Sequence, residues 1–157
     1  MGVLLNYAPK RVLYVSEPLE NSIVAIDLTD DGLAFHVAAV RRIRSNALDQ
    51  PVDLAPVKIE TTDADWASNT TLDVQSDYYV ANRGNNTIVR IRQDGTVVAI
   101  RSLLIAGRTL GNLRLNGIAT SADGTLIWAA VTGHHPGAGH LPGAGLRAGA
   151  VLEMPAF

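Results

Sequence analysis

The sequence predicts an all-β fold built from a repeated antiparallel unit. The first observation is an internal match, in which residues 14–26 (YVSEPLENSIVAI) align without a gap to residues 79–91 (YVANRGNNTIVRI). Self-similarity of this kind indicates a repeat architecture. The second observation is that each copy contains short β-branched and aromatic runs bounded by turn residues, which is typical of strands. The third is the lack of a sustained helical period, since the nearest stretch, residues 103–115, is interrupted by two glycines.

The first copy covers about residues 11–42 and contains three predicted strands. They lie at residues 12–15, 22–28 and 33–40, with the turn Asp30-Asp31-Gly32 before the third. Aspartate and glycine in this order favour a tight turn between antiparallel strands. No inner strand is recognisable before residue 12, so we expect the first unit to be incomplete.

The second copy, at about residues 70–105, is predicted to be complete. Its strands are expected at residues 72–75, 78–81, 87–92 and 96–102. Asn85-Asn86 and Asp94-Gly95 provide residues that tolerate the positive φ of two-residue hairpin turns. The third copy, at about residues 113–157, has predicted strands at 117–120, 125–131 and 150–154, and no outer strand after them. Trp128 occupies the place of Tyr14 and Tyr79 in this copy, so we expect it to pack against a neighbouring sheet.

Two segments interrupt the repeat. Residues 43–69 contain two prolines and several aspartates, which favours a long surface loop. Residues 133–150 form a Gly/Pro/His-rich loop with the motif PGAG at 136–139 and at 142–145. A chain of 157 residues is otherwise expected to be a single domain, residues 1–157.

Composition excludes several classes of partner. The net charge of −2 gives no electrostatic reason to expect binding to nucleic acid. No apolar run approaches the roughly 18 residues of a spanning helix, so we expect no membrane span. The absence of cysteine removes disulfides and thiolate metal sites. Residues 1–10 do not form a signal peptide, although export stays open if the natural start is missing.

Residues 79–91 followed by Asp94-Gly95-Thr96-Val97 resemble a blade of the NHL and YVTN β-propeller repeats. Residues 115–124 (LNGIATSADG) are similar to the opening of a blade in gluconolactonase-like and strictosidine-synthase-like propellers. The resemblance implies a partial β-propeller of about three four-stranded antiparallel blades, with the first and last incomplete. Closed propellers have about four to eight blades. We therefore expect the open sheet edges to be covered by the remainder of a longer propeller, which we favour, or by another subunit.

Propellers carry many unrelated functions, so the candidate sites are considered singly. The first hypothesis is a non-catalytic segment that binds a protein or a small ligand through loops on its top face. Asn82 and Arg83 lie in a loop between strands, and the planar guanidinium of Arg83 suits carboxylate or phosphate. A structural turn, in which Asn and Gly allow positive φ, is the more usual interpretation of these loop residues. His134, His135 and His140 lie close enough to gather around a zinc or copper ion, although their spacing matches no established zinc pattern, and solvated histidines are the simpler interpretation.

The alternative hypothesis is part of a metal-dependent gluconolactonase-like hydrolase. The resemblance implies that Asn116, in Asn116-Gly117, ligates a divalent cation such as Ca²⁺ or Zn²⁺ in the central channel. A cation there would polarise an ester carbonyl and activate water. The acidic opening of that family is missing from this sequence, so we favour a role in which Asn116 caps or bridges backbone groups in the channel. No Ser–His–Asp pattern or phosphate-binding glycine motif is present.

Overall fold

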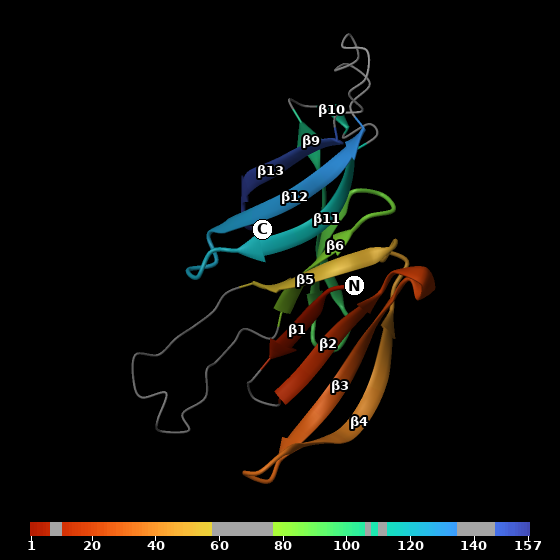
Figure 1. The fold of residues 1–157 in the computed structure, drawn as a ribbon, viewed down its shortest axis with the longest axis vertical. Helices are drawn as coiled ribbons and strands as arrows, with labels where there is room; N and C mark the ends of the chain where they lie inside the picture. The colour runs from red at the N-terminus through yellow and green to blue at the C-terminus, as the bar shows by residue number, and fades with distance from the viewer. Residues whose placement is uncertain (7–10, 58–76, 106–107, 110–112, 135–146) are drawn as a thin grey trace.

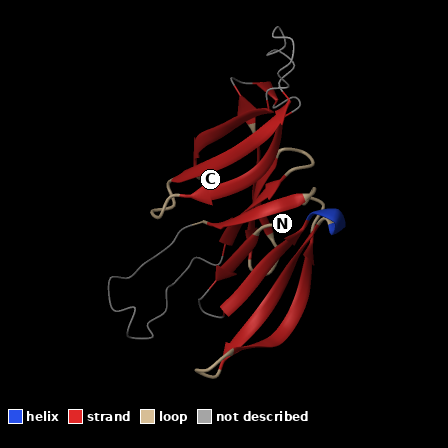
Figure 2. Ribbon diagram, in the orientation of Figure 1, coloured by secondary structure: helices blue, strands red, loops and turns tan. Residues whose placement is uncertain are grey.

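A computed structural model describes residues 1–6, 11–57, 77–105, 108–109, 113–134 and 147–157 (Figure 1). These residues form thirteen strands and one 3-10 turn, so the expected all-β class is confirmed (Figure 2). The strands make three antiparallel sheets of four, four and three strands, none of which closes on itself, and a short hairpin. No helix among these residues has the length and apolar character needed to cross a bilayer.

The first sheet has the strand order β1–β2–β3–β4. Its strands are β1 (Val3–Asn6), β2 (Arg11–Glu17), β3 (Ser22–Asp30) and β4 (Phe35–Arg44), and the 3-10 turn η1 (Pro18–Glu20) joins β2 to β3. The sheet is complete, and the expectation of a missing inner strand is wrong. Leu4 of β1 pairs with Tyr14 of β2. A run of only four residues carries too little periodicity to be identified from the sequence, and the sheet stabilises it through pairing.

The second sheet has the order β5–β6–β7–β8. Its strands are β5 (Pro51–Pro56), β6 (Asp77–Asn82), β7 (Thr87–Arg92) and β8 (Val97–Ser102). The interpretation of residues 43–69 as a surface loop is wrong at β5, which is the first strand of this sheet. Its two prolines lie at its ends and it is an edge strand, where a missing N–H is tolerated. The strand predicted at residues 72–75 lies outside the described residues.

The third sheet has three strands in the order β11–β12–β13. They are β11 (Leu113–Thr120), β12 (Leu126–His134) and β13 (Arg147–Pro155), and the small hairpin before them joins β9 (Leu104–Ile105) to β10 (Arg108–Thr109). The predicted loop at 133–150 is shorter than expected, because β12 continues to His134 and β13 begins at Arg147, opposite it. Residues 135–146 lie outside the described part of the chain.

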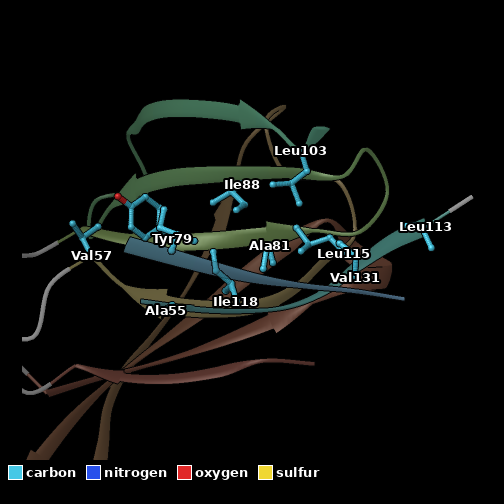
Figure 3. Packing of buried hydrophobic residues seen from close by; sticks show 12 residues of the cluster. Ala55, Val57, Tyr79, Ala81, Ile88, Leu103, Leu113, Leu115, Ile118 and Val131 are labelled. Atoms are coloured by element: carbon cyan, nitrogen blue, oxygen red, sulfur yellow. The ribbon is translucent and has the colours of Figure 1, made fainter. Parts of the chain in front are cut away.

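The second sheet packs between the other two and supplies side chains to two apolar clusters. Tyr78, Val80 and Val89 of the second sheet pack with Tyr14 and Ile23 of the first. The other face packs against the third sheet, and Figure 3 shows Tyr79, Ala81 and Ile88 near Leu115, Ile118 and Val131. Burying a large aliphatic side chain contributes about 1.5–3 kcal/mol. These clusters are therefore the main source of cohesion between the sheets.

The matching segments of the repeat have the same register in the two four-stranded sheets. Tyr14 pairs with Ala25 in the first sheet, and Tyr79 pairs with Arg90 in the second. Both tyrosines are fully buried and point toward the following sheet. Trp128, expected to pack in the same way, lies outside both clusters and is partly exposed. Because side chains alternate along a strand, Trp128 faces away from the second sheet, opposite to Ile127 and Ala129.

Candidate functional site

Three connections meet at one end of the first two sheets. They are residues 18–21 between β2 and β3, residues 45–50 between β4 and β5, and residues 83–86 between β6 and β7, and we call them together the loop face. The backbone amide of Gly84 donates to Asp49 O at 3.0 Å, and that of Arg83 donates to Gln50 O at 3.0 Å. Gln50 N in turn donates to Asn21 Oδ1 at 2.7 Å. These bonds fix the three connections to one another.

Asn82, a candidate binding residue, is completely buried at the base of the loop face. Its Nδ2 donates to Ala47 O at 2.7 Å and to Thr87 Oγ1 at 3.0 Å. Its Oδ1 accepts a hydrogen bond from Asp49 N at 3.3 Å. The side-chain amide of Asn82 thus forms its hydrogen bonds with other groups of the protein. These bonds hold the turn at residues 83–86 against residues 45–50.

Arg83 is exposed directly above this buried amide. Within the described part of the chain, its guanidinium has no ion-pair or hydrogen-bond partner, and its backbone is anchored to Gln50. A guanidinium on an anchored backbone can present two parallel N–H groups to a carboxylate or a phosphate. Asn85 and Gln50 are also exposed on the loop face and add polar groups around it.

Two asparagines of the loop face, Asn21 and Asn86, occupy matching positions of the repeat. Both have positive φ, 49° and 55°, as expected for Asn86 from the sequence. Each bonds to the start of the following sheet. Asn21 accepts a hydrogen bond from Gln50 N. Asn86 accepts from Leu115 N at 2.9 Å and donates to Leu113 O at 3.0 Å. Sequence reasoning identified turn formers here and missed their bridging role, although the aligned asparagines were a signal for it.

The structure brings one of the three candidate histidines to the same end of the molecule. His134 ends β12 opposite Arg147, one residue beyond the pair formed by Gly133 and Leu113. Leu113 is the residue whose carbonyl is bonded by Asn86. His135 and His140 lie outside the described residues. Among the residues that are described, no group of three or more His, Cys, Asp or Glu side chains could hold a metal ion.

Asn116, the candidate cation ligand, lies in β11. Its Nδ2 donates to Arg114 O at 3.0 Å and to the hydroxyl of Thr132 on the neighbouring strand. These bonds join Asn116 to its own strand and to β12.

A carboxylate that sequence reasoning missed, Asp53, lies close to this strand. Its Oδ2 accepts from Ile118 N at 3.0 Å, and its Oδ1 accepts from Leu54 N at 3.0 Å. The first strands of the sheets are tightly packed around it, since a Cβ on Gly2 would lie only 2.3 Å from Asp53 Cα. Asp53 was missed because it lies in the segment interpreted as a loop. Both of its oxygens bond backbone amides, so it joins β5 to β11.

The carboxyl groups of several turns have lowered pKa values. Backbone amides of Leu33 and Ala34 lower the pKa of Asp31, and that of Thr96 lowers the pKa of Asp94. The hydroxyl of Ser121 is the main cause for Asp123. A lowered pKa keeps each group ionised at neutral pH, where it stabilises its own turn. These carboxylates are therefore unsuited to donate a proton near neutral pH.

Comparisons with known proteins identify no relative of this chain. No family model matches the sequence, and no curated protein or solved structure shows significant similarity to the chain. The function is therefore inferred from the geometry of these residues.

Proposed function

We propose that the chain is a sector of a β-propeller that acts as a non-catalytic binding module, with the loop face as its ligand-binding surface. The observation that carries this proposal is the contrast between Asn82 and Arg83. The amide of Asn82 is buried and fully engaged in anchoring the turn, whereas the guanidinium of Arg83 is exposed. A preorganised backbone lowers the entropy lost when a ligand binds.

The chemistry of Arg83 selects an anionic ligand. A guanidinium forms charge-assisted bonds with carboxylate or phosphate oxygens in a bidentate geometry. The exposed amides of Gln50 and Asn85 add hydrogen-bonding capacity around it. The ligand is therefore a protein segment or a small molecule that presents one of these two groups.

The propeller arrangement is supported by the order of the sheets. Three antiparallel sheets follow one another along the chain, and consecutive sheets pack face to face through the two apolar clusters. The first strands of the sheets approach one another, as the bonds of Asp53 to β11 illustrate. The hairpins β2–β3 and β6–β7 of the two four-stranded sheets also share one register. Blades of a propeller are repeated sheets whose first strands lie closest to a common axis.

A titration with defined probes tests the binding surface. Amide resonances of the ¹⁵N-labelled chain are followed during addition of a hexaglutamate peptide and, separately, of inorganic phosphate. We expect saturable shifts at residues 83–86 with at least one probe, and the two arms separate carboxylate from phosphate recognition. The variant Arg83→Ala should weaken binding about tenfold or more, as expected from the loss of a charge-assisted pair.

Arg92→Ala is the matched control, because Arg92 is exposed at the opposite end of the same hairpin. It carries the same charge and leaves the loop face intact, so binding should be unchanged. The absence of saturable shifts with both probes, or an equal loss in the two variants, would contradict the proposal.

The hydrolase alternative depends on Asn116, and the carboxylate of Asp53 lies close to the same strand, where it accepts from Ile118 N. Both side chains already bond the protein itself, through Thr132 and Arg114 in one case and through Leu54 and Ile118 in the other. A calcium site needs about six to eight oxygen ligands, and these two residues supply few. Calorimetric titration with Ca²⁺, repeated on Asn116→Ala, tests this alternative: binding that the variant loses would support it.

A further inference from the structure

The first sheet presents an apolar face to the solvent, on the side opposite to the second sheet. Its register places Leu13 beside Leu5, Ile26 and Val40, and Val15 beside Val3 and Val24. We call this set of side chains the open face. Val3 is 54% exposed and Val40 is 63% exposed. Contiguous apolar surface of this kind on a described sheet marks an interaction site.

In the second sheet, the face that corresponds to the open face is covered by a neighbouring sheet. The residues that match Leu13, Val15, Val24 and Ile26 in the repeat are Tyr78, Val80, Val89 and Ile91. All four are buried, with exposed fractions of 1% or less. They are covered by the first sheet, and the ring of Tyr14 lies 4.6 Å from that of Tyr78. The open face therefore has the pattern of a surface that another sheet covers.

The covering residue in each internal contact is the matching aromatic residue. Tyr14 extends from the first sheet onto the second, and Tyr79 extends from the second toward the third. Trp128 holds the same place in the third sheet and faces away from the second sheet. Val151 lies beside it on this face and is 69% exposed. We call this surface, which contains Trp128, Ala130 and Val151, the Trp128 face.

We infer that the open face of one chain is covered by the Trp128 face of a second copy of the same chain. The inference rests on the propeller sector proposed above and adds its partner. In this contact Trp128 lies against Leu13 of the other copy, as Tyr14 lies against Tyr78 within one chain. The contact thus continues the sheet packing that the chain already uses twice.

Symmetry determines the size of the assembly. The contact joins two different surfaces of the chain. Copies joined in this way form a closed ring only if the rotation that relates neighbouring copies, when repeated, returns to the first copy. The described residues form three sheets of three or four strands in each copy, so two copies give six sheets, which lies within the range of about four to eight for closed propellers. Both open faces and both Trp128 faces are then covered in a two-fold ring.

Charged side chains flank both faces. Glu153, beside Trp128 in the register, is exposed and accepts a hydrogen bond from Trp128 Nε1 at 2.9 Å. On the open face, Arg42 lies beside Val24 and forms an ion pair with Glu17 at 2.9 Å, and Arg11, at the start of β2, forms an ion pair with Asp30.

Light scattering coupled to gel filtration, over a series of concentrations, tests this inference. The full chain should have twice its mass of 16.7 kDa. Val24→Arg and Trp128→Glu should each give monomers, whereas Ile100→Arg should not, because Ile100 lies on β8 outside both faces and is 55% exposed. Far-UV circular dichroism and the urea midpoint report whether each variant is folded.

Mixing the two disruptive variants gives the sharpest test. Val24→Arg retains its Trp128 face and Trp128→Glu retains its open face, so the mixture should form dimers that neither variant forms alone. A folded monomer at every concentration, growing polymers, or a dimer broken by Val24→Arg but not by Trp128→Glu would overturn the inference. A chain that stays monomeric but still binds the probes at Arg83 would contradict only the inferred dimer. A dimer that does not bind the probes would contradict only the proposed binding function.

Discussion

The side chain of Asn86, in the turn between β6 and β7, holds the backbone of Leu115 in β11, the first strand of the next sheet. Its Oδ1 accepts from Leu115 N at 2.9 Å, and its Nδ2 donates to Leu113 O at 3.0 Å. A single side chain in a hairpin turn thus satisfies two backbone groups of the following sheet.

Replacing Asn86 by alanine should strongly destabilise the protein. The change leaves two backbone groups in a buried region without partners, at about 1–3 kcal/mol each, and places a Cβ-bearing residue at positive φ without the local bonds of asparagine. We expect a loss of about 2–4 kcal/mol in the free energy of unfolding by urea. Asn86→Gly loses the same bonds but tolerates the φ, so it should be the milder variant. An alanine variant as stable as the parent would contradict the bridging role.

Tyr78 and Tyr79 should respond differently to loss of the hydroxyl. Among the described atoms the buried hydroxyl of Tyr78 has no partner, and burial raises the pKa of Tyr78 far above its ordinary value. Tyr79 donates to Phe157 O at 2.9 Å. Tyr78→Phe should leave stability unchanged or raise it, whereas Tyr79→Phe should cost about 1 kcal/mol, as measured by the midpoint of thermal unfolding. The opposite ranking would show that the hydroxyl of Tyr78 has a partner.

Gly95 should not accept a side chain. Its φ is +91°, and an added Cβ would lie 3.1 Å from Cγ2 of Ile43, so strain and crowding act together. Gly95→Ala should therefore cost about 1 kcal/mol or more. Gly32 is the matched control, because its φ is +86° and an added Cβ would meet nothing within 4 Å. Equal losses of stability in the two variants would mean that contact with Ile43 contributes nothing.

Acid should weaken the turn at Asp123. The hydroxyl of Ser121 and the amide of Thr125 lower the pKa of Asp123 below its ordinary 3.8 in the folded chain. A lowered folded pKa contributes stability above the unfolded value, and this contribution is lost as the pH falls through the folded pKa. The free energy of unfolding of Asp123→Asn should therefore fall less steeply with pH below 3.8 than that of the parent. Parallel curves in urea titrations at a series of pH values would contradict this assignment.

The hairpins were predictable because their signals are local. Residues 14–26 and 79–91 each contain two strands and the turn that joins them, so one contiguous pattern determines the register. The turn at residues 83–86 was recognised for the same reason, although Asn82, expected to lie in it, is the last residue of β6. Positive φ at Asn86 and Gly95 followed from residue type alone.

The first strands of the sheets were harder to predict, because their stability comes from partners and not from their own pattern. β1 has four residues, and β5 has a proline at each end and is separated from β6 by residues 57–76. The contact of Asp53 with Ile118 joins residues distant in sequence. The exposure of Trp128 depends on whether a further sheet covers it, which a repeat alignment does not specify.

Asn21 and Asn86 each attach their own hairpin to the sheet that comes next, and neither attaches it to the sheet before. These side-chain bonds therefore run from each sheet to the sheet that follows it in the sequence. Excising the middle hairpin would remove the bonds that position β11, whereas excising the last sheet would leave the attachment of β5 to η1 and its neighbours intact. The placement of β11 therefore depends on the hairpin that precedes it, whereas the bond of Asn21 to Gln50 does not involve the last sheet.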